Sequence, residues 1–126
     1  MTYASALELL DRYSRARSEW DGDAFVDLHS PDVESHDDPF EPPLVGHNAI
    51  RRHLLDASQF EEQVEFVFER HWVVARTILA AWHASYVHRQ TRARVRFAGF
   101  STFEVAADGR IERARYWYNR AETPAG

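Results

Sequence analysis

A short strand, a proline-rich loop and a helix follow one another in the stretch Glu34-Ser-His-Asp-Asp-Pro-Phe-Glu-Pro-Pro-Leu-Val-Gly-His-Asn-Ala-Ile-Arg-Arg-His-Leu55. We expect the strand at residues 33–38, with Asp38 at its end, because Pro39 has no N–H with which to continue the ladder. A carboxylate held at such a break can point into a cavity and act as a general base. The alternative is a solvated turn residue, since aspartate before proline is common in turns. The sequence leaves both interpretations of Asp38 open.

Helical signals are confined to the first half of the chain. Apolar residues at helical spacing predict an amphipathic helix over residues 3–19. A second, short helix is expected over residues 24–29, where Asp23 can cap it. A third helix is expected over residues 47–57, with an apolar stripe along one side.

From residue 63 onward the apolar residues recur with a period of two, which predicts long strands. The Asp108-Gly109 turn, a strong hairpin signal, starts the last strand, over residues 110–120. Helices that precede a run of consecutive strands indicate the α+β class. We therefore expect one domain over residues 1–126, with three N-terminal helices packed in a curved, mainly antiparallel sheet. Residues 33–38 would form a short edge strand, and the interior of such a cone can hold a ligand.

The composition excludes several classes of function. The chain has 126 residues, a net charge of −5 and no cysteine, so disulfides, thiolate metal sites and thiol nucleophiles are excluded. No basic stripe with interleaved aromatic residues indicates a nucleic-acid partner. No apolar run reaches membrane-spanning length, and the N-terminus lacks the apolar core of a signal peptide. We expect a cytoplasmic protein that binds neither nucleic acid nor membrane.

Several motifs of the chain resemble the nuclear transport factor 2-like superfamily, and within it the SnoaL-like and ketosteroid-isomerase-like enzymes. The resemblance covers residues 6–122 and implies a cystatin-like cone. It leaves the function open, because this scaffold hosts isomerases, dehydratases, epoxide hydrolases, polyketide cyclases and non-catalytic binders. The motifs that carry it are Gly22-Asp23, Asp38-Pro39, Gly46-x-x-Ala49-Ile50-Arg51 and the last strand, Asp108-Gly-Arg-Ile followed by Arg115-Tyr-Trp-Tyr118.

Three isomerase positions carry over to this sequence by the resemblance. Asp38 matches the aspartate that shuttles a proton beside a carbonyl, and Tyr13 matches the helix tyrosine that donates to the substrate oxygen. The third isomerase residue, a protonated aspartate, falls on Ser101. A hydroxyl can donate a hydrogen bond, but it is a weaker oxyanion partner than a carboxylic acid.

Strand parity predicts the walls of a cavity. If Asp38 faces inward, so does His36, two residues before it on the same strand. His88 falls on the inner face of a long strand, and a histidine near an aspartate in an aromatic cavity can be tuned for acid–base work. The other inner positions are mostly aromatic, as in small-molecule pockets, although Trp82 and Phe103 fit a plain core as well. We expect substrate contacts from Trp82, Tyr86, Gly99, Ser101, Phe103, Tyr116 and Tyr118.

The spacing of the remaining histidines does not indicate a metal site. There is no His-x-x-x-His pair, and we predict no metal site and no cofactor. His29, His47 and His53 are interpreted as surface residues, whereas His71 and His83 are predicted to lie on the outer face of the sheet. We expect this face to form a homodimer, because a solitary chain would leave Trp117 in water. The same face carries Arg113 and Arg115.

Three functions fit these features. The first is a cofactor-free isomerase, cyclase or dehydratase that acts on a hydrophobic, carbonyl-containing small molecule, with Asp38 moving the proton. The second is a non-catalytic ligand-binding or dimerisation module with the same cavity. The third is a relative of epoxide hydrolases, in which Arg15 or Arg17 would join two carboxylates to activate water. The sequence does not separate the first two, because both need the same cavity.

Overall fold

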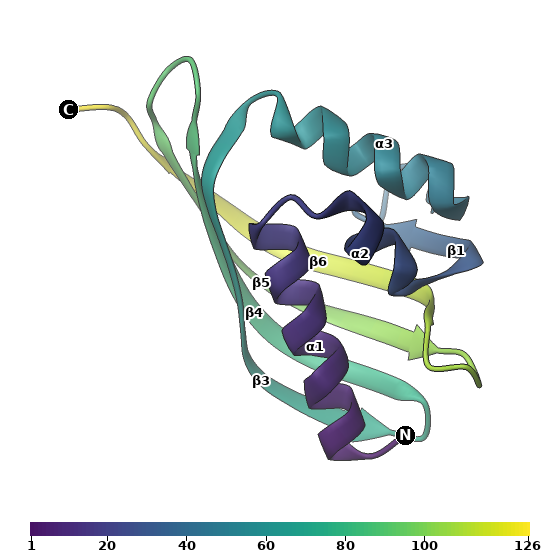
Figure 1. Cartoon of the computed structure of the whole chain (residues 1–126). Coiled ribbons are helices and arrows are strands. Elements are labelled where there is room, and N and C mark those ends of the chain that lie inside the picture. The colour runs from purple at the N-terminus through teal and green to yellow at the C-terminus, as the bar shows by residue number, and fades with distance from the viewer.

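The computed structural model describes all 126 residues and places its helices on one face of a curved sheet (Figure 1). Helix α1 packs on β3, and helix α3 packs on β1. None of the helices has the length and apolar character that a membrane crossing requires. The elements follow the order α1 (Tyr3–Ser18), α2 (Gly22–Asp27), β1 (His29–His36), β2 (Leu44–Val45), α3 (Gly46–Ser58), β3 (Glu61–Val74), β4 (Thr77–His88), β5 (Arg94–Val105) and β6 (Ile111–Thr123).

The sheet has six strands in the order β2-β1-β6-β5-β4-β3. All neighbouring strands are antiparallel except β1 and β6, which run parallel. The predicted α+β class and mainly antiparallel sheet are confirmed, and the arrangement is consistent with a cone. The prediction of an edge strand at residues 33–38 is wrong, because β1 lies between β2 and β6 and already begins at His29. Its register on β6 shifts between His29 and Glu34, where Pro31 has no N–H to give to the ladder.

The ends of the helices follow from local hydrogen bonds. A capping box, in which Thr2 and Ser5 satisfy each other's backbone N–H groups, starts α1. Asp21, not Asp23, caps α2, because its carboxylate accepts the N–H of Ala24 at 3.1 Å. The second helix therefore begins and ends earlier than the sequence predicts, which leaves His29 free to enter β1.

Strand β3 changes the face it presents part way along its length. Phe66 and Phe68 pack against the core, but the register on β4 shifts after Phe68. Such a bulge inserts one residue and reverses the alternation that follows it. His71 is consequently buried and stacks on Tyr3 of α1 with 4.0 Å between ring centroids, whereas Trp72 turns outward. The prediction that His71 lies on the outer face is wrong for this reason.

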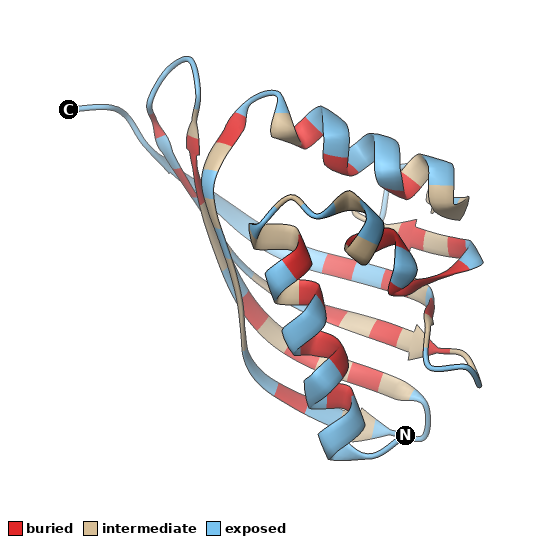
Figure 2. Ribbon diagram, viewed as in Figure 1, coloured by how far each residue is buried: buried red, intermediate tan, exposed pale blue.

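The core lies where the helices face the sheet (Figure 2). Phe103 is fully buried in this core. Gly99 leaves room for a close contact within the sheet: a Cβ there would lie 2.4 Å from a ring carbon of Trp82 and 2.8 Å from the carbonyl oxygen of Trp117. The indole of Trp82 can lie over the sheet only because residue 99 has no side chain, and its Nε1–H donates to Ser101 Oγ at 2.7 Å.

Candidate functional site

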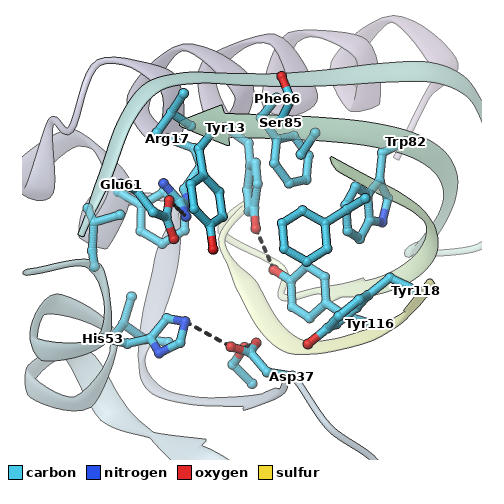
Figure 3. Close-up of a pocket in the computed structure, with 18 of the residues that line it drawn as sticks. Tyr13, Arg17, Asp37, His53, Glu61, Phe66, Trp82, Ser85, Tyr116 and Tyr118 are labelled. Carbon is cyan, nitrogen blue, oxygen red and sulfur yellow. Dashed lines mark hydrogen bonds and ion pairs between the residues drawn. The ribbon is translucent and has the colours of Figure 1, made fainter. Parts of the chain in front are cut away.

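A cavity of about 340 Å³ lies between the helices and the inner face of the sheet. Side chains from every helix contribute to its wall, together with side chains from the sheet. Most of the wall is apolar or aromatic, and the polar side chains fall into a few pairs (Figure 3). This composition is typical of a small-molecule site, in which a few polar groups orient an apolar ligand.

The first polar pair joins the end of β1 to α3. Asp37 directly follows β1, and its Oδ2 lies 2.9 Å from Nε2 of His53 (Figure 3). The hydrogen bond to Asp37 raises the pKa of His53 above its ordinary value, although partial burial of the ring acts against this. Both side chains keep partial access to water, with 37% of the aspartate and 54% of the histidine exposed. The pair can therefore exchange protons with a ligand and with solvent.

The second polar pair consists of two phenols. The hydroxyl oxygens of Tyr13 on α1 and Tyr116 on β6 lie 2.6 Å apart, and both residues are buried. Burial raises the pKa of both phenols, and the negative charge of Asp37 adds to the effect. Both phenols are therefore protonated at neutral pH. Since one O–H donates to the other, the second O–H proton is free to donate to a ligand oxygen.

The third polar pair is an ion pair between α1 and β3. Arg17 Nη2 donates to Glu61 Oε1 at 3.0 Å, and its guanidinium lies over the ring of Trp20, 4.8 Å from the centroid. Pairing with Asp37 is the main cause of the raised pKa of His53, but the charges of Arg17 and Glu61 also act on it. The Arg17–Glu61 pair and the Asp37–His53 pair therefore act on each other electrostatically.

A buried histidine also lines the cavity. His29 is 1% exposed, and its Nδ1–H donates to the carbonyl of Phe25 at 2.8 Å. Burial lowers the pKa of His29 to about 4, so the ring is neutral at physiological pH. His47 contacts the same residue, with its ring nitrogen 2.8 Å from the His29 carbonyl oxygen. The interpretation of His29 as a surface residue is wrong.

The structure turns Asp38 and His36 away from the cavity. Within β1, Ser35 is buried and pairs with Ala114, whereas His36 pairs with the exposed Arg115. Asp37 therefore lies on the inner face with Ser35. The prediction that His36 and Asp38 face inward is wrong by one residue. Asp38 is exposed, and its Oδ1 accepts the N–H of Phe40 at 2.9 Å, as in a turn.

His88 also lies outside the cavity wall. Its Nδ1 accepts the backbone N–H groups of Gln90 and Thr91 at 3.2 and 3.3 Å, which holds the turn between β4 and β5. Its ring stacks on Phe60 with 5.9 Å between centroids. These contacts explain the position of His88 without a ligand.

The predicted substrate contacts divide into two groups. Trp82, Tyr86, Tyr116 and Tyr118 line the cavity together with Tyr13, as strand parity predicts. Gly99, Ser101 and Phe103 do not belong to its lining residues. Ser101 and Phe103 are fully buried, and Gly99 borders an open groove beside the loop that carries Asp38.

Asp37, His53 and Glu61 line the cavity, although the sequence patterns predict no role for any of them. Val33 could have indicated the position of Asp37. An apolar residue marks the inward face of a strand, and residues 33, 35 and 37 share that face. His53 adjoins Leu54 in the apolar stripe of α3, which places it at the edge of the buried face. Glu61 had no comparable signal. No group of three or more His, Cys, Asp or Glu side chains is arranged to hold a metal ion.

The fold and the cavity agree with the result of a family comparison. The SnoaL-like domain family matches residues 10–114, and the chain belongs to this family. A comparison with curated protein sequences found no match.

Similar solved structures include enzymes of three kinds. One is SalBIII, an epoxide hydrolase/cyclase-like enzyme in pyran ring formation in the polyether salinomycin, with 19% identity, a TM-score of 0.79, and 89% of this chain and 88% of that chain covered. Another is a Δ5-3-ketosteroid isomerase from Mycobacterium sp., with 14% identity, a TM-score of 0.80, and 94% and 98% covered. A third is an LEH-like epoxide hydrolase from M. tuberculosis, with 19% identity, a TM-score of 0.78, and 92% and 84% covered. At these identities the likeness shows the fold alone.

Proposed function

We propose that this chain is a cofactor-free acid–base enzyme of the isomerase, cyclase or dehydratase type, and that its substrate is a hydrophobic, carbonyl-containing small molecule. One observation carries the proposal: the Asp37–His53 pair and the Tyr13–Tyr116 pair line the same aromatic cavity. A proton acceptor and a hydroxyl donor in one apolar site are the two groups that enolisation of a ketone requires.

In the proposed reaction, Asp37 removes a proton from the carbon beside the substrate carbonyl. The electron pair of the broken C–H bond moves to the carbonyl oxygen, and the free O–H of the Tyr13–Tyr116 pair donates to that oxygen. Asp37 then returns the proton to another carbon in an isomerisation. In a dehydration, a hydroxyl on the next carbon leaves instead, and the imidazolium of His53 supplies the proton that makes it water. Aromatic side chains would hold the substrate rings, namely Trp82, Tyr86 and Tyr118.

Proton transfer is assigned to Asp37 and not to Asp38. Asp37 lines the cavity and pairs with His53, whereas the carboxylate of Asp38 is exposed and committed to the N–H of Phe40. His36 and His88 receive no role in proton transfer, because neither lines the cavity.

The experiment measures enolisation directly on a probe ketone. 2-Tetralone has acidic protons between its ring and its carbonyl, and NMR follows their exchange for deuterium in D2O. We expect the wild-type protein to accelerate this exchange and Asp37→Asn to lose about a hundredfold or more of the acceleration. Asp38→Asn is the matched control and should stay within about twofold of wild type. Equal losses in both variants, or no acceleration by the wild type, would contradict the proposal.

A second candidate function is epoxide opening, with Arg17, Glu61 and Asp37 in one cavity. An arginine between two carboxylates can orient a water molecule that one carboxylate deprotonates, while a phenol protonates the epoxide oxygen. Two of the similar structures are described as epoxide hydrolases or as epoxide hydrolase/cyclase-like. Conversion of styrene oxide to its diol in H2¹⁸O, lost in Glu61→Gln but kept in Asp38→Asn, would favour this function.

A non-catalytic binder of the same ligand class is the remaining alternative. It would bind 2-tetralone without accelerating deuterium exchange and without opening styrene oxide. Calorimetric titration of 2-tetralone beside the exchange assay therefore separates a binder from an enzyme.

We also propose a homodimer through the outer face of the sheet. Trp72, Phe100 and Trp117 are 37% to 45% exposed there, and the rings of Trp72 and Phe100 lie 6.3 Å apart. A patch of this kind on a solitary chain would leave large apolar side chains in water. Light scattering at micromolar concentration should give twice the mass of the chain, and Trp117→Glu should reduce it to the monomer mass. A monomeric wild type would contradict the proposal.

A further inference from the structure

One buried nitrogen at the cavity has no hydrogen-bond partner. Arg17 Nη2 donates to Glu61, but Nη1 of the same guanidinium is enclosed by protein and meets no acceptor. Arginine carries five N–H donors in a planar fork, and a buried donor without an acceptor costs free energy. Arg17 lines the cavity, so a ligand in the cavity can supply the acceptor that the protein does not.

Two neighbours set the position of the guanidinium. Glu61 binds one arm of the fork, and the ring of Trp20 lies under its face. Only 19% of the Arg17 side chain and 9% of the Glu61 side chain are exposed, so water screens this pair weakly. Because Nη1 is enclosed by protein as the side chain lies here, a ligand oxygen reaches it only when the guanidinium turns toward the cavity with its bond to Glu61 kept.

The charges around the cavity decide what kind of oxygen fits. Arg17 and Glu61 cancel each other, and Asp37 is balanced only while His53 is protonated. Arg120 also borders the cavity, but about half of its side chain is exposed, where water screens the charge. A carboxylate on the ligand would therefore add negative charge to a weakly screened site that has no cation to spare.

We propose that Arg17 is a specificity-determining residue whose Nη1 binds a neutral hydrogen-bond acceptor of the ligand, and that Glu61 makes the cavity select ketones, lactones or amides over carboxylates. The inference deepens the proposed function and rests on it for the conclusion that the bound ligand is a substrate. It adds a second polar contact on α1, apart from the Tyr13–Tyr116 pair.

The test uses three probes of nearly equal shape. 2-Acetonaphthone carries a neutral acceptor, 2-naphthoate carries an anionic one, and 2-ethylnaphthalene carries none. Calorimetric titration of the wild type should show the ketone bound about tenfold more tightly than either of the others. Arg17→Lys keeps a cation for Glu61 but lacks the rigid second nitrogen, and should reduce the preference for the ketone over the hydrocarbon to about twofold. Arg15→Lys, an exposed position on the same helix, is the matched control and should bind like wild type.

Glu61→Gln tests the second half of the inference. It leaves the charge of Arg17 unbalanced, so affinity for 2-naphthoate should rise about tenfold while affinity for the ketone changes little. If Arg17→Lys lowers the melting temperature, the double variant Arg17→Met with Glu61→Gln removes both charges together and should also lose the preference for the ketone. An unchanged ketone preference in Arg17→Lys and in the double variant would overturn the inference and leave a buried water as the partner of Nη1.

The deuterium-exchange assay separates this inference from the proposed function. A ketone preference that depends on Arg17, in a protein that does not accelerate exchange, would support the binding role and contradict the enzyme. Exchange that depends on Asp37, with a ketone preference that ignores Arg17, would support the enzyme and overturn the inference.

Discussion

The buried end of the cavity and its opening hold their polar groups in opposite ways. At the buried end, Tyr13, Tyr116 and His29 are each less than 10% exposed, and all three are uncharged at neutral pH. At the opening, Asp37 and His53 are partly exposed, and their hydrogen-bonded pair is charged when His53 is protonated. Burial penalises charge, so a hydrogen-bond donor that stays neutral can be enclosed, whereas a group that exchanges protons with its surroundings must keep contact with water. The buried end should therefore dominate stability, and the opening should dominate proton transfer.

The largest expected effect on stability comes from the close packing of Trp82 on the sheet at Gly99. Gly99→Val places a side chain on a ring carbon of Trp82, which is buried in the core, and on the carbonyl oxygen of Trp117, which belongs to the backbone of β6. We expect the free energy of unfolding to fall by about 3 kcal/mol. Urea unfolding measures this change, with the exposed neighbour Ala98→Val as a control that should stay within about 0.5 kcal/mol. A stable Gly99→Val protein would show that Trp82 has room to rearrange.

The next largest expected effect is a pH dependence of the free energy of unfolding, caused by His29. The folded-state pKa of His29 is about 4, below the ordinary 6.5, so the unfolded chain binds the proton more readily between these values. This contribution to stability is complete above pH 6.5 and is lost as the pH falls toward 4. Between pH 7 and pH 5 we expect a loss of about 2 kcal/mol that His29→Gln abolishes. Urea unfolding at both pH values tests it, with His83→Gln on the outer face as the control. The same pH dependence in His29→Gln as in wild type would contradict the assignment.

A smaller effect is expected at the pair of phenols. Tyr116→Phe removes the hydroxyl that pairs with Tyr13, and the exchange rate of 2-tetralone should fall about tenfold. The free energy of unfolding should fall by about 1 kcal/mol, because the buried hydroxyl of Tyr13 loses its partner. Tyr3→Phe, on the surface of α1, should change neither quantity. Unchanged exchange in Tyr116→Phe would remove the phenol pair from the proposed mechanism.

The smallest expected effect on stability comes from the Asp37–His53 pair at the opening of the cavity. The hydrogen bond to Asp37 raises the pKa of His53, so Asp37→Asn should lower it toward 6.5. The sign is opposite to that of His29: the stability from this pair is complete below pH 6.5 and is lost as the pH rises through the folded-state pKa. An NMR titration of the His53 ring protons measures the shift. Asp38→Asn should leave the titration unchanged, and an equal shift in both variants would contradict the pairing.

Local patterns in the sequence predict the order and type of the helices and strands. The period of two after residue 63, the Asp108-Gly109 turn and the helical spacing in the first half predict helices followed by a mainly antiparallel sheet, and the structure has both. The same parity predicts that Trp82, Tyr86, Tyr116 and Tyr118 line the cavity. These predictions rest on the spacing of apolar residues within single helices and strands, which can be read from the sequence directly.

Tertiary structure decided the polar groups of the site. Position 37 faces inward because Val33 and Ser35 pack against the core, and Asp38 turns outward one residue later. His71 faces inward because a bulge in β3 reverses the alternation. His53 meets Asp37, and Arg17 meets Glu61, across elements that are far apart in the chain. Such pairings depend on how helices and strands dock, and a shift of one residue in register exchanges the inner and outer faces of a strand, so no local pattern could fix them.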